Sequence, residues 1–363
     1  MAGSGFGTNF RITTWGETHG AGVGVVVDGC PAGLPLERED VQKYLDRRKP
    51  GQSKYTTQRK EGDQVEILSG IFEGRTTGTP ISMVVYNKDQ RSKDYSNIKD
   101  IYRPGHADFT FDMKYGFRDY RGGGRSSGRE TIGRVAAGAV AAKVLKELGI
   151  EIKAYAKAIA GIEVSKDHFD FAEMNNNPFN MPDKEAAKLV QEKADQMIKE
   201  MDSIGGIIEC QIKGMPVGIG ETVFDKLDAE LSKAIMSIGS VKGFEIGDGF
   251  EAANLRGSEN NDDFICVDGK VEKETNHSGG VLGGMSDGSA IVFRAAIKPT
   301  PSIAQTQKTV NRDLDNVEIE IHGRHDPMIV PRAVVVVESM AAVTILDGVL
   351  KLSLIHISEP TRQ

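Results

Sequence analysis

The sequence predicts a single domain of mixed α and β structure. The chain has 363 residues, 39% of them hydrophobic, so one domain can bury a sizeable core. Stretches rich in β-branched residues alternate along the chain with stretches in which apolar residues recur at helical spacing. No linker-like segment divides the sequence, and we therefore expect one compact unit.

The first elements are strands and one helix. FRITTWGETHGAGVGVVVDG (10–29) predicts a strand, a glycine-rich loop and a second strand at Val23–Val27. LEREDVQKYLDRR (36–48) has apolar residues at helical spacing and acidic residues in its first turn, so it predicts a helix that ends at Pro50. QVEILSGIFEG (64–74) and TPISMVVYN (79–87) predict paired strands joined by a turn.

A central helix is expected at TIGRVAAGAVAAKVLKELG (131–149), where Ile132, Val135, Val140 and Val144 recur at helical spacing. Its alanines and glycines predict very close packing against a neighbouring backbone, in the interior. Further helices are expected around Glu185–Met201, Phe224–Ser237 and Val335–Leu350. They alternate with strands in EIKAYAKAIAGIEV (151–164), GIIECQIKGMPVGIG (206–220), AIVFRAAIKPT (290–300) and VEIEIHG (317–323).

The segment from Asn87 to Arg121 shows no clean periodicity and is long for a loop in a compact domain, which is typical of functional or disordered segments. Between Arg91 and Arg134 there are ten Lys or Arg against six Asp or Glu, although the whole chain has a net charge of −7. This contrast predicts a local anion site. The acidic balance of the chain argues against nonspecific nucleic-acid binding, which depends on excess Lys and Arg.

The cysteines and the lengths of the apolar stretches indicate the cellular compartment of the protein. Cys30, Cys210 and Cys266 are widely spaced and form no C-x-x-C pair, so neither a disulfide framework nor a zinc site is indicated. The sequence has no uninterrupted run of 18 apolar residues, and its N-terminus lacks the apolar region of a signal peptide. We expect a cytoplasmic protein without a membrane segment.

The C-terminus differs from the rest. LSLIHISEPTR (Leu352–Arg362) is a word-for-word translation of a transposase adapter used in sequencing libraries. We therefore interpret residues 1–351 as the natural domain and residues 352–363 as adapter-coded, and exclude His356 from functional reasoning. The alternative is a genuine amphipathic extension.

DYRGGGRSSGRET (119–131) is open to three interpretations. Its glycines could make a linker or a simple turn. An RGG-type nucleic-acid tract is less favoured, because such tracts repeat in disordered segments and this one occurs once, beside an alanine-rich helix. The third interpretation is a phosphate site. It places Ser126, Ser127 and Arg129 in the first turn of the helix, where free N–H groups attract anions. No lysine follows in the spacing of a Walker loop.

Histidines stand in three glycine-containing stretches. His19 lies in GETHGAG and His106 in YRPGHADFT. A lone loop histidine is usually solvated, but histidine can exchange a proton near neutral pH and could assist a leaving phosphate. HGRHDP places His322, His325 and Asp326 together after a strand, in no recognised metal-ligand pattern.

LDRRKPGQSKYTTQR (45–59) gathers basic residues just beyond a predicted helix. They are Arg47, Arg48, Lys49, Lys54 and Arg59. One interpretation is a solvated basic surface. The other is a set of arginines that covers a small substrate with several negative charges, since the planar guanidinium suits both phosphate and carboxylate.

Taken together, eight stretches resemble the blocks of the chorismate synthase family, in order and over nearly the whole natural chain. They are TTWGETHG, LDRRKPGQSKYTTQR, RPGHAD, RDYRGGGRSSGRET, SIGSVKGFEIGDGF, NHSGGVLGG, KPTPSI and GRHDP. The resemblance implies an α+β fold, a single-domain βαβ sandwich with helices packed between antiparallel sheets, assembled as a homotetramer. It also implies the last step of the shikimate pathway, an anti-1,4-elimination that converts 5-enolpyruvylshikimate 3-phosphate to chorismate and phosphate. Reduced FMN is required without net redox change.

Roles follow from the resemblance at matching positions. His19 would assist the departing phosphate, His106 would protonate or polarise the flavin ring, and Asp326 would help to handle the proton at the flavin's reactive nitrogen. The substrate's anionic groups would be held by Arg48, Lys54, Arg103, Arg129 and Arg324. FMN contacts would come from Arg125, Ser126, Ser127, Gly239, Ser240, Gly283, Lys298, Pro299, Thr300, Pro301, Ser302 and Arg324. Whether NADPH reduces the flavin on this protein stays open.

The sequence departs from the family's common pattern at a few positions. Thr18 stands where Ser is usual, Lys54 where Arg is frequent, Gly128 where Ala is usual, and Gly239–Ser240 where many relatives have Asn-Ala. Lys54 keeps the charge but loses the bidentate fork of arginine. Two rival interpretations are an FMN oxidoreductase that carries out net hydride transfer and an RNA-binding protein.

Overall fold

Two antiparallel sheets enclose a layer of helices in the computed structural model of the chain, which describes residues 3–57, 61–88, 99–321 and 326–355. The first sheet has the order β1-β2-β3-β7-β4, with strands Gly5–Phe6, Arg11–Gly16, Gly22–Asp28, Ile81–Tyr86 and Val65–Ile67. The second has the order β11-β16-β10-β8-β9, with strands Val241–Ile246, Ile291–Ile297, Gly206–Lys213, Glu151–Ile159 and Ile162–Glu163.

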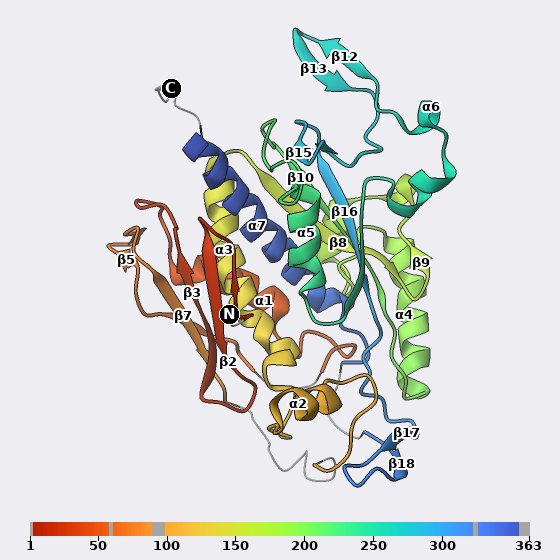
Figure 1. Ribbon diagram of the computed structural model, residues 1–363. Coiled ribbons are helices and arrows are strands. Elements are labelled where there is room, and N and C mark those ends of the chain that lie inside the picture. Colours follow the sequence, from red (N-terminus) through yellow and green to blue (C-terminus); the bar gives the residue numbers. More distant parts are fainter. Residues whose placement is uncertain (1–2, 58–60, 89–98, 322–325, 356–363) are drawn as a thin grey trace.

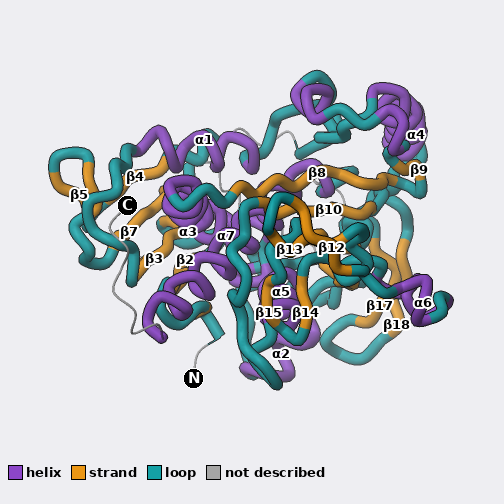
Figure 2. Tube along the Cα trace, turned by 90° about the horizontal axis from the view of Figure 1, so that it is seen from above, coloured by secondary structure: helices purple, strands orange, loops and turns teal. Residues whose placement is uncertain are grey.

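The helices between the sheets form the central layer (Figures 1 and 2). α3 (Thr131–Glu147) packs on strands of the first sheet, α7 (Val330–Ile355) packs on β8 and β10 of the second, and the two helices pack on each other. α1 (Arg38–Arg48) and α5 (Leu227–Met236) complete the layer, whereas α4 (Lys184–Lys199) lies outside, against β9. The expected βαβ sandwich is therefore confirmed.

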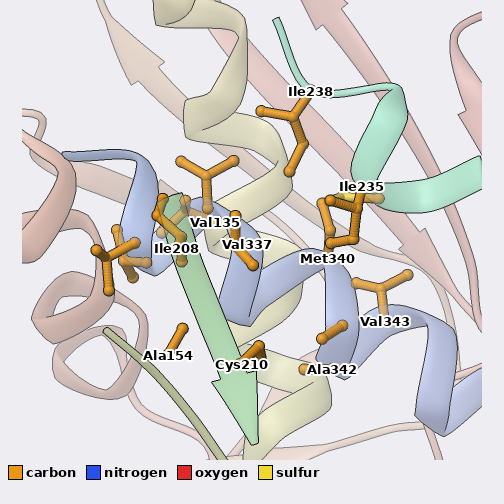
Figure 3. Packing of buried hydrophobic residues seen from close by; sticks show 14 of the residues in the cluster. Val135, Ala154, Ile208, Cys210, Ile235, Ile238, Val337, Met340, Ala342 and Val343 are labelled. Carbon is orange, nitrogen blue, oxygen red and sulfur yellow. The ribbon is translucent and has the colours of Figure 1, made fainter. Parts of the chain in front are cut away.

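Small residues bring α3 and α7 together, as the sequence predicts. A Cβ atom added to Gly138 of α3 would lie 2.2 Å from the Cβ of Ser339 in α7, a distance that real atoms do not reach. Around this contact, Val135 of α3, Ile208 and Cys210 of β10, and Val337 and Met340 of α7 pack as one apolar core (Figure 3). A glycine is required here because no other residue lets the two backbones approach so closely.

α7 begins at Val330, five residues before the predicted start, and is the most apolar helix of the described chain. By length and composition its segment Val330–Leu352 could cross a membrane, but 72% of its most apolar window is buried inside the structure. Arg332, Glu338 and Asp347 interrupt the apolar residues. Core helices of soluble proteins have the same character, so this helix is weak support for a membrane span.

Other predicted elements hold with shifted ends, and some were missed. α5 begins at Leu227 and not at Phe224, and β18 covers only Asn316–Ile319. α2 (Asp108–Tyr115) lies inside the segment expected to be irregular. Short hairpins pair β5 (Ile71–Phe72) with β6 (Arg75–Thr76), β12 (Phe264–Val267) with β13 (Lys270–Lys273), β14 (Val281–Leu282) with β15 (Met285–Ser286), and β17 (Gln307–Val310) with β18; α6 is Gly257–Asn260.

Candidate active site

Most of the predicted site residues gather at the end of the sandwich where α7 begins and α2 lies (Figure 1). They come from the end of α1, the loop before α2, the turns before α3, and the segments after β16 and before α7, and residues from the segments before β4 and after β7 join them. Within the described chain they form two groups. We call them the arginine–carboxylate cluster and the His106 cluster.

The arginine–carboxylate cluster consists of Arg48, Glu61, Asp63, Arg129 and Asn87. Arg48 Nη1 lies 2.8 Å from Asp63 Oδ2, and Arg129 Nη1 lies 2.9 Å from Asp63 Oδ1. Arg129 also donates from Nε to Asn87 Oδ1 at 2.6 Å, and its Nη2 lies 3.5 Å from Glu61 Oε2. Arg48, Arg129, Glu61 and Asp63 are all buried. Two cations from α1 and from the turn before α3 thus meet on one buried carboxylate.

α7 extends this cluster toward Asp326. Arg332, in the first turn of α7, donates from Nε to the backbone oxygen of Arg48 at 2.9 Å and from Nη1 to Asp326 Oδ2 at 2.6 Å. Asp326 Oδ1 accepts from the backbone N–H of Thr57 at 2.9 Å. Burial lowers the pKa of Arg48 to about 10, an effect that the nearby Asp63 carboxylate opposes. Arg48 therefore remains a cation at neutral pH.

The His106 cluster lies in the loop before α2. Arg103 binds Asp108 in a bidentate manner, with Nε–Oδ2 and Nη2–Oδ1 distances of 2.7 and 2.8 Å. His106 Nδ1 is 2.9 Å from the oxygen of Pro104, and its Nε2 is 2.9 Å from Ser302 Oγ. Burial, together with the charges of Arg103 and Lys298, lowers the pKa of His106 below its ordinary value. The ring is neutral at pH 7.

The tautomer of His106 follows from its partners. A carbonyl oxygen only accepts, so Nδ1 carries the proton and donates to Pro104. Nε2 then has a free lone pair that accepts from the hydroxyl of Ser302. The ring presents its basic nitrogen toward the segment 298–302.

The two clusters adjoin through the segment before β10. Ser203 Oγ donates to the oxygen of Thr300 at 2.7 Å, while Ile204 forms a parallel bridge with Met328, two residues beyond Asp326. The segments that carry Ser302 and Asp326 therefore lie on either side of one strand-like segment. Pro301 in turn packs so closely on Gly105 that a Cβ at Gly105 would lie 2.6 Å from the Cβ of Pro301.

His19 brings the glycine-rich loop after β2 against the segment 119–124. A Cβ atom at Gly122 would lie 3.0 Å from His19 Cδ2, and Gly122 has a φ of +143°. The pKa of Asp119 is lowered mainly by a hydrogen bond from Arg121, with a smaller contribution from the charge of His19. Two stretches that are far apart in the sequence thus lie against each other.

The expectation that Ser126, Ser127 and Arg129 lie in the first turn of the central helix is wrong. Ser126 ends the short 3₁₀ helix Gly124–Ser126, Arg129 lies in a second one, Gly128–Glu130, and Ser127 connects the two, whereas the N-cap of α3 is Glu130. Arg125 donates to the oxygen of Gly16 at 3.0 Å and to Thr14 Oγ1 at 2.7 Å. Ser126 donates to the oxygen of Gly123 and Ser127 accepts from the N–H of Arg129. In this chain the three side chains stabilise the turn.

Of four further predicted positions, two lie away from both clusters and two lie beside one of them. Lys54 is exposed, and its Nζ lies 2.7 Å from Asp195 Oδ1 of α4. Ser240 accepts from the N–H of Lys298 at 2.9 Å, so Gly239 and Ser240 lie beside the His106 cluster. Gly283 lies in the β14–β15 turn, at the start of α5, because the backbone oxygen of Gly284 accepts from the N–H of Leu227. Ser240 lies beyond the other end of this helix. Because ten helical residues span about 15 Å, Gly283 is separated from the other predicted flavin contacts.

The remaining predictions concern residues outside the described chain or positions without a specific contact. Arg59, His322, Arg324 and His325 lie outside the described ranges. A Cβ atom at Gly128 or Gly239 would meet nothing within 4 Å, so the structure does not explain why glycine stands at either position. Among residues 3–57, 61–88, 99–321 and 326–355, no group of three His, Cys, Asp or Glu side chains is arranged to bind a metal.

The segment 298–302 carries polar and charged groups of the kinds that bind the hydrogen-bonding edge and the phosphate of a flavin. Thr300 Oγ1 is buried without a hydrogen-bond partner among the described residues, and Lys298 supplies a cation whose Nζ is 3.1 Å from the oxygen of Gly105. Ser302 and His106 add a hydroxyl and a ring nitrogen. A donor left unsatisfied beside a cation and a basic nitrogen is suited to a polar, anionic ligand.

Several residues of the site were missed by the sequence analysis. Asp63, Glu61, Asn87 and Arg332 contact the predicted arginines and Asp326. The only signal for Glu61 and Asp63 was the acidic pair in EGDQVE between two predicted elements. Arg332 lies outside the helix predicted at Val335–Leu350, because Pro331 and Arg332 interrupt the apolar residues that precede it.

Comparisons with known proteins identify the family of the chain. The sequence model of the family described as "Chorismate synthase" matches residues 10–350. A chorismate synthase of Lachnospira eligens is 69% identical over 347 residues, covering 96% of this chain and 95% of the relative, and one of Agathobacter rectalis is 65% identical over 350 residues, with the same coverage. A solved structure titled "Crystal Structure of Chorismate Synthase" superposes with a TM-score of 0.76 at 30% identity, covering 96% of this chain and 93% of that one. The chain belongs to the chorismate synthase family.

Proposed function

We propose that the arginine–carboxylate cluster and the His106 cluster together bind and convert the substrate of the family's reaction. That reaction is the 1,4-elimination of phosphate and a ring hydrogen from 5-enolpyruvylshikimate 3-phosphate, which makes the enzyme a carbon–oxygen lyase. The observation that carries the proposal is the position of buried arginines beside a neutral, half-buried histidine at one end of the sandwich. Cations for an anionic substrate and a group that exchanges a proton are both present.

Substrate anions are assigned to Arg48, Arg129 and Arg103, whose guanidinium groups are oriented by carboxylates before the substrate arrives. An oriented guanidinium binds phosphate or carboxylate with less loss of freedom than a mobile side chain. Arg324 completes this set by the resemblance. Lys54 stays a prediction as a fifth contact, and its ion pair with Asp195 must open for it to contribute.

Proton handling is assigned to His106, His19 and Asp326. His106 is held neutral and offers Nε2, so it can take up a proton at this atom or polarise a neighbouring group. His19, on the loop that meets Gly122, assists the departing phosphate. Arg332 and the N–H of Thr57 bind Asp326 and hold its carboxylate in place.

The family implies a flavin cofactor, and we assign reduced FMN to the segment 298–302 together with Gly239, Ser240, Arg125, Ser126 and Ser127. When bound, reduced FMN supplies electron density that helps the phosphate to leave, and recovers it when the ring hydrogen is lost. Gly283 contributes in this assignment only through a second copy of the chain, which agrees with the proposed homotetramer. We also propose a cytoplasmic location and no nucleic-acid partner.

The test is an anaerobic incubation of the protein with chemically reduced FMN and 5-enolpyruvylshikimate 3-phosphate, in which phosphate and chorismate are measured together. Equal amounts of both, many per flavin and without flavin oxidation, support the lyase. Flavin oxidation in proportion to product would instead support an FMN oxidoreductase. Replacing the chemical reductant by NADPH in a parallel sample determines whether the protein reduces its own flavin.

A further inference from the structure

Asp63 holds an unusual position at the centre of the arginine–carboxylate cluster. Its side chain has 0% exposure, and its two oxygens bind different guanidiniums, Oδ2 that of Arg48 and Oδ1 that of Arg129. The backbone of Asp63 has a φ of +42°, in the left-handed region that few residues other than glycine, Asn and Asp adopt. A buried charge in this conformation costs free energy and is retained where it serves another purpose.

Asp63 is the carboxylate that the two guanidiniums share. Arg48 and Arg129 are 3% and 8% exposed, and like charges at short range repel strongly when water is excluded. Burial already lowers the pKa of Arg48. The Asp63 carboxylate offsets this repulsion and fixes one Nη1 atom of each arginine, which determines where the other N–H groups point.

Neighbouring groups fix the remaining freedom of the pair. Asn87 accepts from Arg129 Nε at 2.6 Å, and Arg332 binds the backbone oxygen of Arg48 at 2.9 Å. Neither residue contacts both arginines in the described chain. Asp63 is therefore the residue that sets their separation.

We propose that Asp63 is a positioning residue, which holds Arg48 and Arg129 at the separation needed to bind two anionic groups of one substrate molecule. This inference rests on the proposed function, in which the two arginines contact the phosphate or carboxylates of the substrate. Asp63 itself does not contact the substrate, since both of its oxygens are directed at the arginines.

A simple charge-neutralising role predicts the opposite kinetic effect. If Asp63 only reduced the positive charge of the site, removing its charge would strengthen the attraction for an anionic substrate and lower KM. If Asp63 positions the arginines, removing its charge misplaces them. A misplacement of about 1 Å costs on the order of 100-fold in rate.

The decisive variant is Asp63→Asn, because Asn tolerates the left-handed backbone and has the same size. The amide oxygen of Asn can accept from one arginine, but its NH₂ group would face the other arginine, and two donors cannot form a hydrogen bond. We expect kcat/KM to fall by about 10- to 100-fold, through kcat and without a lower KM. A lower KM with unchanged kcat, or kinetics equal to the wild type, would overturn the proposal.

A matched control is Asp262→Asn. Asp262 is also a buried carboxylate paired with a buried cation, at 3.0 Å from Lys273 Nζ, in the segment before the β12–β13 hairpin. We expect this control to keep the wild-type kcat and KM, because Asp262 does not bind Arg48 or Arg129 in the described chain. Circular dichroism and thermal melting of both variants separate kinetic effects from loss of folded protein.

A second variant decides the question if Asp63→Asn does not fold. Asp63→Glu keeps the charge and moves the carboxylate by one methylene, so a neutralising role predicts wild-type kinetics and a positioning role predicts a lower kcat/KM. Wild-type protein that does not convert 5-enolpyruvylshikimate 3-phosphate would refute the proposed function itself. An active wild type with unaffected Asp63 variants would refute only this inference.

Discussion

The arginine–carboxylate cluster and the His106 cluster lie at the same end of the sandwich but balance their charges in opposite ways. In the first, Arg48 and Arg129 pair with Asp63, and Arg332 pairs with Asp326. In the second, the titratable ring of His106 is near two cations, Arg103 and Lys298, and its nitrogens contact neutral oxygens. One cluster stabilises charge, while the other holds a group in its uncharged form.

The two clusters also differ in the structural elements that carry them. The first cluster is connected to α1, the turn before α3 and the first turn of α7, which are fixed by the packed core. The second lies on the loops before α2 and after β16. Arg48 and Arg129 are therefore held on or beside elements that the core fixes, whereas His106 and Arg103 are held on a loop.

The largest expected effect tests the neutral side of this comparison. We expect His106→Ala to fold normally and to lose about 10²- to 10⁴-fold in kcat, because a positioned proton-exchanging group contributes about this factor. Turnover is measured in the anaerobic assay with reduced FMN. The change removes the hydrogen bond to Ser302 but leaves the Arg103–Asp108 ion pair in place.

The control for this variant is His168→Ala, since the side chain of His168 is 52% exposed and lies 3.7 Å from Glu185 at the start of α4. It should turn over substrate like the wild type. Near-wild-type turnover by His106→Ala would remove His106 from the mechanism and end the contrast between the two clusters.

The next effect concerns the charged side and is a loss of stability. Arg129→Met removes a cation that is 8% exposed from a carboxylate that is 0% exposed. Breaking a buried pair on one side usually costs about 3–5 kcal/mol, and we expect a loss near the lower value because Arg48 still pairs with Asp63. Urea unfolding followed by circular dichroism gives the free energy of unfolding.

Arg312→Met is the comparison for this measurement. Arg312 also binds a carboxylate, that of Asp112 at 2.7 Å, but its side chain is 39% exposed. Its loss should cost at most about 1 kcal/mol. If both variants lose the same free energy, burial does not distinguish the first cluster from a surface ion pair.

Much of the fold could be predicted from local pattern. The alternating valines of β3 and the alanine- and glycine-rich stretch of α3 determine which faces are buried, so both elements were predicted from the sequence. α2 was missed because Phe109 and Met113 are exposed and give it no buried apolar face. Its position depends instead on the ion pairs of Asp108 and Asp112 with Arg103 and Arg118, which no local pattern reveals.

The site was predicted to a different extent in each cluster. His19, His106, Arg48 and Arg129 were identified from motifs, and their prediction as catalytic or substrate-binding residues remains to be tested. Asp63 and Arg332 were missed, because a carboxylate that bridges two arginines from distant elements is defined only by the tertiary fold. Sequence motifs indicated candidate side chains for the chemistry, and the structure adds the residues that orient them.

The smallest expected effect sharpens the comparison at a single proton. Burial lowers the pKa of His106 most, and the charges of Arg103 and Lys298 lower it further, so we expect Lys298→Gln to raise this pKa. A histidine with a folded-state pKa below its unfolded value contributes stability that is complete above the unfolded pKa and is lost as the pH falls toward the folded pKa. Because the variant brings the folded-state pKa closer to the unfolded value, it narrows the pH range over which this stability is lost and makes the protein less sensitive to mild acid. NMR titration of the His106 Cε1 proton measures the shift, with the signal assigned by its absence in His106→Ala. The control is Lys270→Gln on the exposed β12–β13 hairpin. An unchanged or lower pKa in Lys298→Gln would mean that the charge of Lys298 does not contribute, and that burial and Arg103 keep His106 neutral without it.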